Sequence, residues 1–252
     1  MRLENKVAII TGGGTGIGRQ AAIDMALEGA KVLVMGRRPE PLEETVEEIN
    51  KAGGTALAFA GDVTKTEDIE KARDLVREEW GRLDILVNNA GSGMRKPFME
   101  TTLEEFDYIY QIDLRSVFLV TQVLLPLMQE GGNGSIINVS SILGVLGSKN
   151  SSAYCAMKGG VVQLTRALAA ELGPAIRVNC LCPSHIVTPM MQWEIDRLEA
   201  AGKMDKLNRL FPMKRVGYPD DMSGSIIFFA SDESKWLTGN IFMIDGGLSC
   251  YC

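Results

Sequence analysis

Residues 7–18 read VAIITGGGTGIG, a short apolar run followed at once by a glycine-rich turn. An apolar, β-branched run of this kind is typical of a buried strand, and the residues after the turn are expected to open a helix. A glycine-rich turn in this position lets backbone N–H groups approach a phosphate, which the positive end of the helix dipole also attracts. The stretch therefore predicts a dinucleotide pyrophosphate site formed by Gly12, Thr15, Gly16, Ile17 and Gly18; the alternative is that the glycines only form a structural turn.

Six further apolar runs alternate with amphipathic stretches along the rest of the chain. Strands that are buried on both faces and joined by helix-length connections pair in parallel through right-handed crossovers. We therefore expect an α/β fold, a single doubly wound Rossmann-type parallel sheet of about seven strands with helices on both faces, and one domain spanning 1–252. The expected strands are 7–11, 32–35, 55–60, 85–87, 135–139, 176–181 and 241–244.

Charge and hydropathy argue against several classes of partner. The 252 residues carry a net charge of −6, which gives no electrostatic reason to bind nucleic acid or an anionic membrane. The N-terminus lacks the pattern of a signal peptide, and no apolar run approaches the ~18 residues that span a bilayer. We therefore expect a cytoplasmic protein that binds neither nucleic acid nor a membrane.

The cysteines do not indicate a metal site or a disulfide framework. The chain has five of them, at 155, 180, 182, 250 and 252, and a single histidine, His185. Their spacing does not match a zinc motif, and an odd number of cysteines in apolar segments favours reduced, packed thiols. A redox or capping role for the terminal pair, Cys250 and Cys252, is the alternative.

The end of the second expected strand indicates which dinucleotide binds. Arg37 and Arg38 follow Gly36, where the adenosine ribose lies in a dinucleotide-binding fold. A carboxylate at this point would bind the 2′-hydroxyl of NAD(H), whereas a guanidinium pairs with the 2′-phosphate of NADP(H). The pattern favours NADP(H) over NAD(H); the alternative is that the two arginines belong to an ordinary solvated loop.

A tyrosine and a lysine share one face of a helix expected over residues 151–172. Tyr154 and Lys158 are four residues apart, which places their Cβ atoms ~5–6 Å from each other. A phenol with the ordinary pKa near ~10 is a poor base, but a neighbouring ammonium group stabilises the phenolate and lowers that pKa. The alternative interpretation is a half-buried tyrosine beside an exposed lysine.

Polar and small residues follow two other expected strands. Ser140 and Ser141 end the fifth strand, and Asn89, Ala90 and Gly91 come after the fourth. Ligands of open α/β sheets bind outside the carboxyl ends of the strands. Ser141 is therefore placed to hold a carbonyl oxygen, and the small residues are placed to admit a nucleotide, although either segment by itself could be an ordinary turn.

A second long helix, expected over residues 103–129, carries an acid on its buried face. Asp113 has the same helical phase as an apolar stripe made of Phe106, Ile109, Tyr110, Val117, Val120 and Leu124. A carboxylate therefore interrupts the buried face of this helix.

Together these motifs resemble the short-chain dehydrogenase/reductase family over nearly the whole chain. The similarity includes the thirteen-residue interval from Ser141 to Tyr154. The other features, in chain order, are Thr-Gly-x-x-x-Gly-x-Gly at 11–18, Asp62-Val63, Asn88-Asn89-Ala90-Gly91, Tyr154-x-x-x-Lys158 and Asp245-Gly246-Gly247.

The resemblance implies an oxidoreductase that moves a hydride between NADP(H) and a ketone or secondary alcohol, and a homotetramer. It implies that Tyr154 exchanges a proton with the substrate oxygen, that Ser141 orients this oxygen, and that Lys158 binds the nicotinamide ribose. The other cofactor contacts implied are Asp62, Val63, Asn89, Ala90, Gly91, Pro183, Ile186 and Thr188.

Two positions depart from the family pattern. Asp113 stands where the family has an asparagine that helps to seat a water in a proton relay beyond the lysine. We count Asp113 among the catalytic residues and expect its charge to alter the coupled titration of Tyr154 and Lys158. Ser184 follows Pro183 where glycine is usual, which slightly restricts the loop over the nicotinamide.

The segment 188–215 resembles the family's substrate lid. Its apolar side chains either cover the pocket or pack against a neighbouring subunit, and His185 before it either touches substrate or is an ordinary residue. The apolar lid residues are Met190, Met191, Trp193, Leu198, Leu210, Phe211 and Met213. A carrier-protein substrate is disfavoured, since the nearby loops at 131–134 and 173–175 have no basic residue.

Two other functions remain as alternatives. A fold does not fix a function, so a non-catalytic NADP(H)-sensing or scaffold protein could use the same architecture. A sugar-nucleotide epimerase is a weaker alternative, because such chains are usually longer and have a differently spaced glycine turn.

Overall fold

The computed structural model describes residues 1–251 and is built on a seven-stranded sheet. The strands are β1 Val7–Thr11, β2 Lys31–Gly36, β3 Thr55–Ala60, β4 Ile85–Asn88, β5 Gly134–Val139, β6 Ile176–Pro183 and β7 Ile241–Ile244. Their order in the sheet is β3-β2-β1-β4-β5-β6-β7, with every neighbouring pair parallel. The order reverses between β1 and β4, which is where open α/β sheets bind ligands.

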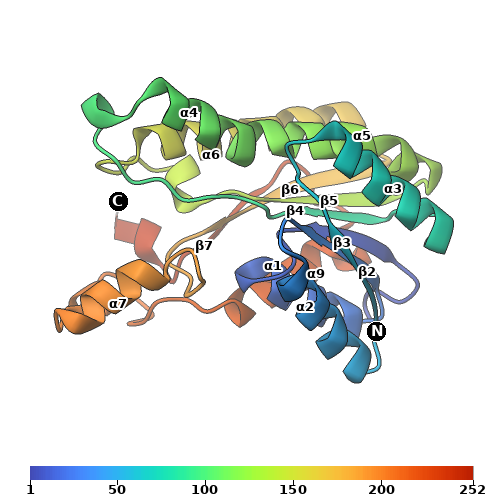
Figure 1. Ribbon diagram of the computed structural model, residues 1–252, viewed down its shortest axis with the longest axis horizontal. Helices are drawn as coiled ribbons and strands as arrows, with labels where there is room; N and C mark the ends of the chain where they lie inside the picture. The colour runs from blue at the N-terminus through green and yellow to red at the C-terminus, as the bar shows by residue number, and fades with distance from the viewer. Residues whose placement is uncertain (252) are drawn as a thin grey trace.

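Helices cover both faces of this sheet. They are α1 Gly16–Leu27, α2 Pro39–Lys51, α3 Thr66–Trp80, α4 Leu103–Tyr110, α5 Ser116–Glu130, α6 Ser152–Leu172, α7 Gln192–Ala200, α8 Met204–Asn208 and α9 Asp220–Ala230. In the view of Figure 1, α3, α4, α5 and α6 lie above the sheet, and α1, α2 and α9 lie below it. The predicted doubly wound α/β fold is confirmed.

The alternation of side chains along β1 explains why its first four residues, 7–10, are all apolar. Ala8 and Ile10 belong to the core cluster that also holds Met25 of α1. Ile9 belongs to the opposite cluster with Leu124 of α5. Because successive strand residues point to opposite faces, a strand covered on both sides favours apolar side chains at every position, and the polar residue of β1, Thr11, is its last.

The long helix predicted over 103–129 is interrupted by a wider turn. Between α4 and α5 the chain forms a π-helical turn, Gln111–Arg115. Ile109 and Asp113 are buried as predicted, whereas Phe106 and Tyr110 are each 38% exposed. The wider turn rotates α4 relative to α5, so the single apolar stripe predicted for the whole helix is wrong at these two aromatic residues.

The run from α4 to α5 also bears on the expectation that no apolar segment is long enough to span a bilayer. Within residues 1–251, Leu103–Glu130 is long and apolar enough, by length and composition alone, to cross a membrane. Half of its most apolar window is buried inside the protein. Helix α5 packs against α3 and β4, as a core helix of this fold does.

The cysteines of the described chain carry free thiols. They are Cys155, Cys180, Cys182 and Cys250. The Sγ atoms of Cys180 and Cys182, both buried in β6, lie 3.9 Å apart. Cys252, named above in the terminal pair, lies outside the described residues.

Candidate active site

A cavity of about 760 Å³ lies at the carboxyl edge of the sheet, where the loops after β1, β4, β5 and β6 meet. This volume is within the range of small-molecule and cofactor sites. The residues predicted from sequence that line it are Gly12, Thr15, Gly16, Ile17, Asn89, Ala90, Gly91, Ser141, Tyr154, Lys158, Pro183, Ile186 and Thr188. The structure thus brings together segments that are far apart in the chain.

The glycine-rich turn after β1 has a backbone that only glycine adopts easily. Gly12 and Gly16 have positive φ values of 67° and 56°. A Cβ atom on Gly18 would lie 2.3 Å from the carbonyl oxygen of Gly12, so this position also has to be glycine. Thr15, the N-cap of α1, gives no side-chain cap to the helix. The first N–H groups of α1 therefore remain free for an anion, which fits a dinucleotide phosphate.

Hydrogen bonds tie the loop after β4 to the loop after β1. The Asn89 Nδ2 donates to the carbonyl oxygens of Thr11, at 3.0 Å, and Gly12, at 3.3 Å. The backbone N–H groups of Asn89 and Ala90 both donate to the Thr11 Oγ1, at 3.0 Å each. Asn89 consequently holds the two loops together at the point where the strand order reverses. This arrangement is compatible with a role of the segment Asn89, Ala90 and Gly91 in positioning a nucleotide.

Helix α6 carries Tyr154 and Lys158 toward the end of β5. The Lys158 Nζ lies 5.7 Å from the centre of the Tyr154 ring and donates to the carbonyl oxygen of Val139 at 3.3 Å. The Ser140 Oγ donates to the backbone carbonyl of Lys158 at 2.8 Å, which holds α6 against the strand. Ser141 Oγ accepts the N–H of Leu143 at 3.1 Å and interacts with the Tyr154 hydroxyl.

Asp113 lies behind this group and does not line the cavity. It is fully buried in the π-helical turn, and its Oδ1 accepts the backbone N–H of Ser92 at 2.7 Å. Its Oδ2 has no hydrogen-bond partner. A methyl group on Gly91 would lie 2.9 Å from the Asp113 Oδ1 and 3.4 Å from the Lys158 Nζ, so the carboxylate and the ammonium flank one glycine.

The electrostatics of these groups differ from the sequence-based expectation. Burial raises the pKa of Tyr154, and the field of Lys158 lowers it by less, so the net direction is upward. Burial is the strongest single influence on the pKa of Lys158 and acts to lower it, but the negative fields of Asp113, Tyr154, Cys180 and Cys182 together outweigh burial, so the net direction is again upward. The expectation of an acidic phenol was wrong for the protein without a cofactor, because it ignored desolvation.

Comparison with known proteins places this site in a family. Residues 12–249 match the family model described as enoyl-(acyl carrier protein) reductase. The chain is 38% identical over 249 residues to 3-oxoacyl-(acyl-carrier-protein) reductase of Thermotoga maritima, covering 98% of this chain and 99% of that one. The chain belongs to the short-chain dehydrogenase/reductase family. It is an oxidoreductase of that family acting on alcohol or ketone groups, and the family uses nicotinamide cofactors.

Two solved structures of the family have the same fold. Levodione reductase superimposes with a TM-score of 0.94 at 32% identity, over 100% of both chains. A variant of actinorhodin polyketide ketoreductase, solved with NADPH, gives a TM-score of 0.92 at 31% identity, over 96% of this chain and 97% of that one.

Some of the residues predicted from the family pattern lie outside the cavity lining. Arg37 and Arg38 are exposed after β2. Burial acts to raise the pKa of Asp62, but its hydrogen bonds from Thr64, helped by the charge of Arg37, bring the net direction down. Val63 is buried beside Asp62. These residues follow β2 and β3 at the same carboxyl edge, one and two strands beyond the glycine-rich turn.

The lid predicted from the family pattern divides into two parts. Met190, Met191 and Trp193 line the cavity. Phe211 and Leu198 instead pack in a separate small cluster. The lid's other apolar residues, Leu210 and Met213, are more than half exposed. The first part of the predicted lid therefore lies at the cavity, and the second part does not line it.

His185 also lines the cavity. Its ring packs edge-on against Phe211 at 5.7 Å, and its Nδ1 lies 3.2 Å from the Ser184 Oγ. Burial lowers the pKa of His185, so the neutral imidazole is favoured at neutral pH.

Sequence reasoning missed an ion pair at the cavity wall. Arg95 Nη1, from the loop after β4, lies 3.1 Å from the Oε1 of Glu194 in α7, and both residues line the cavity. No motif marks either residue, because the pair depends on how the lid lies over the loop. Only the three-dimensional arrangement could reveal this ion pair.

Proposed function

We propose that the protein transfers a hydride between NADP(H) and a small ketone or secondary alcohol, with Tyr154 as the acid/base. The observation that carries this proposal is the convergence of Ser141, Tyr154 and Lys158 on a cavity that extends to the uncapped start of α1. The relatives named above, a 3-oxoacyl reductase and levodione reductase, support a carbonyl substrate.

Each residue of this group would have a distinct task. When bound, the nicotinamide ring supplies or accepts the hydride. In the direction of reduction, Tyr154 gives its hydroxyl proton to the carbonyl oxygen, and Ser141 donates a hydrogen bond to the same oxygen. Lys158 stays an ammonium ion and offsets the negative charge left on the phenolate.

The change Tyr154→Phe tests this function. It removes the transferable proton and keeps the ring, so turnover of a ketone panel should fall by about 10²–10⁴-fold. NADPH binding, measured by fluorescence titration, should stay nearly unchanged. Turnover equal to that of the unchanged protein would eliminate Tyr154 as the acid/base.

The same assay separates the catalytic proposal from the alternative of an NADP(H) sensor. A sensor or scaffold would bind NADPH and oxidise none of it with any ketone of the panel. Stopped-flow absorbance at the nicotinamide band reports binding and oxidation separately, and a single substrate that is turned over excludes the sensor.

The preference for NADP(H) rests on Arg37 and Arg38, which are exposed and therefore free to pair with a 2′-phosphate. Changing both to alanine should weaken NADPH binding by about 10–100-fold and leave NADH binding almost unchanged. The control is Arg77→Ala, since Arg77 is an α3 arginine paired with Glu130. Equal losses for the two cofactors would refute the preference.

We also propose a cytoplasmic homotetramer, as the family pattern implies. Support for an assembly comes from large apolar side chains at and near α4 that are exposed in the single chain, namely Phe98, Met99, Leu103 and Phe118. Light scattering in solution tests the proposal, and a mass of one chain would overturn it.

A further inference from the structure

Asp113 is the one charged group among the unpaired buried atoms of residues 1–251. Only two buried side-chain atoms of this part of the chain have no hydrogen-bond partner, Asn88 Oδ1 and Asp113 Oδ2. The first belongs to an amide whose Nδ2 donates to Thr121, at 3.0 Å, and to Asn138, at 2.9 Å. The second belongs to a carboxyl group with a single hydrogen bond, from Ser92. Such a group is retained only where something else compensates for its burial.

The compensating charge comes from α6. A methyl group on Gly91 would touch both Asp113 Oδ1 and Lys158 Nζ, so the two charges face each other across the smallest possible residue. The Lys158 ammonium has a hydrogen bond to a neutral carbonyl, that of Val139, and lies 5% exposed. In so buried a place, opposite charges interact over several ångströms with little screening.

The other titratable groups near Asp113 and Lys158 lie on α6 and β6. Tyr154 and Cys155 lie on α6 with Lys158, and the buried thiols of Cys180 and Cys182 face Lys158 from β6. The hydrogen bond with the neighbouring thiol of Cys182, followed by burial, raises the pKa of Cys180. Asp113 is therefore the carboxylate whose charge acts on both Lys158 and Tyr154.

We propose that Asp113 is a positioning residue whose buried carboxylate holds Lys158 as an ammonium ion and keeps the Tyr154 hydroxyl protonated up to higher pH. This inference rests on the proposed acid/base role of Tyr154. A negative charge near the phenol opposes its ionisation and partly cancels the field of Lys158. The phenol is then available as a proton donor for ketone reduction over a wider range of pH.

The effect concerns the pH window and not the equilibrium of the reaction, which no residue of a catalyst changes. Ketone reduction needs the protonated phenol, so its kcat/KM falls as pH rises through the titration of Tyr154. Alcohol oxidation needs the phenolate, so its kcat/KM rises through the same titration. Removing the charge of Asp113 must move both limbs to lower pH.

The test is the change Asp113→Asn, which removes the charge and keeps the shape of the side chain. We expect the falling limb of ketone reduction and the rising limb of alcohol oxidation to move down together by about one pH unit. Asp107→Asn is the matched control, because Asp107 is an exposed aspartate of α4. The control should leave both limbs where they are.

A second measurement does not depend on turnover. Absorbance titration of tyrosinate in the protein without cofactor, taken as the difference from Tyr154→Phe, reports the ionisation of Tyr154 directly. The same difference in the Asp113→Asn background should titrate at lower pH. The inference would be overturned if, in Asp113→Asn, both the limbs of the pH–rate profiles and the tyrosinate titration stayed at the same pH as in the unchanged protein. If no ketone is turned over by any variant, the proposed function fails, and the tyrosinate titration still decides the role of Asp113.

Discussion

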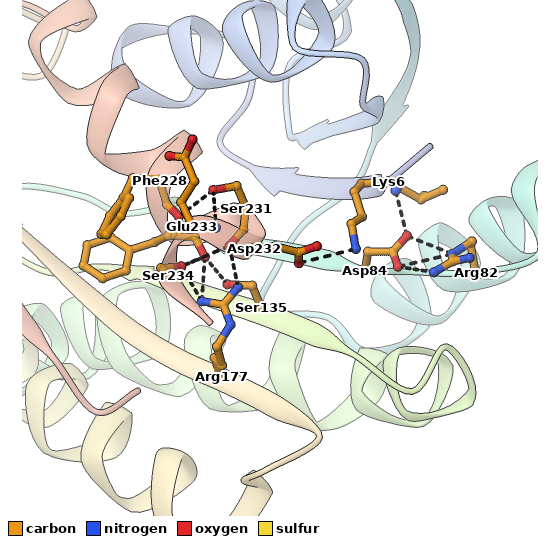
Figure 2. A network of polar contacts seen from close by, with 12 residues as sticks. Lys6, Arg82, Asp84, Ser135, Arg177, Phe228, Ser231, Asp232, Glu233 and Ser234 are labelled. Carbon is orange, nitrogen blue, oxygen red and sulfur yellow. Dashed lines mark hydrogen bonds and ion pairs between the residues drawn. The ribbon is translucent and has the colours of Figure 1, made fainter. Parts of the chain in front are cut away.

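The two edges of the parallel sheet differ in how completely their charged side chains are paired. At the amino edge, where the strands begin, charged side chains are joined in closed networks of hydrogen bonds (Figure 2). At the carboxyl edge, Asp113 and Lys158 are buried with fewer partners than they can hold. One chain forms both edges. We therefore attribute the difference in the pairing of charged groups to the different functions of the two edges.

Asp84 at the amino edge illustrates complete pairing. Its side chain is 1% exposed, and its two oxygens accept from the Arg82 guanidinium at 2.5–3.2 Å. Its Oδ2 also accepts the backbone N–H of Val7, the first residue of β1, at 2.9 Å. The carboxylate therefore links β1 to the start of β4.

Arg177 plays the corresponding part at the start of β6. Its Nη1 donates to the carbonyl of Phe229, at 2.9 Å, and to Ser234 Oγ, at 2.6 Å, and its Nη2 donates to the carbonyl of Ser231 at 3.1 Å. These acceptors lie at the end of α9, where the last carbonyls of a helix lack partners within the helix. Figure 2 shows Arg177 pointing into this group.

Among the described residues, the buried carboxylate that lacks a second partner lies beside Lys158, in the group to which we assign proton transfer. A fully bonded carboxylate such as Asp84 stabilises the fold by linking two strands. A buried carboxylate with one open oxygen is costly for stability and responsive to its surroundings, which is typical of functional sites.

The largest effect is expected for Lys158→Met. It removes the cation that faces Asp113 and leaves a buried carboxylate uncompensated, so the free energy of unfolding should fall by about 3 kcal/mol. Turnover should be lost as well, because the phenolate loses its counter-ion. Urea unfolding and ketone turnover measure the two effects.

The double change Lys158→Met with Asp113→Asn is the control for this prediction. It should recover most of the lost stability and none of the turnover, since the uncompensated charge disappears while the ammonium stays absent. A double variant no more stable than Lys158→Met alone would show that the two groups do not interact.

At the amino edge, Arg177→Leu should reduce stability by about 2 kcal/mol, because the carbonyls of Phe229 and Ser231 each lose a charged donor. Turnover per folded molecule should stay the same, since no atom of this network touches the cavity. Urea unfolding together with active-site titration separates the two quantities. A fall in turnover per active site would contradict the division between the two edges.

The smallest effect is expected for stability in Asp113→Asn. Burial raises the pKa of Asp113, with Lys158 and Ser92 opposing it, so the folded state binds this proton more tightly than the unfolded state does. Ionisation then lowers stability at neutral pH, and this loss disappears as pH falls below the ordinary aspartate pKa of ~3.9. Asp113→Asn should therefore be more stable by about 1 kcal/mol at neutral pH, with no gain in acid. A gain of the same size at every pH would contradict this assignment.

Much of the fold could be predicted from local patterns. Each observed strand lies within two residues of the predicted one, because a strand covered on both faces leaves an uninterrupted apolar run. The glycine-rich turn was predictable for a similar reason, since Gly12, Gly16 and Gly18 are required by the backbone itself.

The phase of the helix around Asp113 was less predictable. A π-helical turn arises from packing between elements, and the sequence of Gln111–Arg115 carries no mark of it. The acid was found as an anomaly in an apolar stripe, but the absence of a second hydrogen bond depends on which loop covers it.

The sequence by itself determined the succession of strands and helices along the chain, the phosphate-binding turn, and the spacing that puts Tyr154 and Lys158 on one face of α6. These follow from backbone geometry over a few residues. Only the tertiary structure decided how the charges act, since the pKa of Tyr154 depends on burial and on Asp113, which is forty-one residues away in the chain. Desolvation and long-range charge are properties of the space that the fold encloses, and no local pattern encodes them.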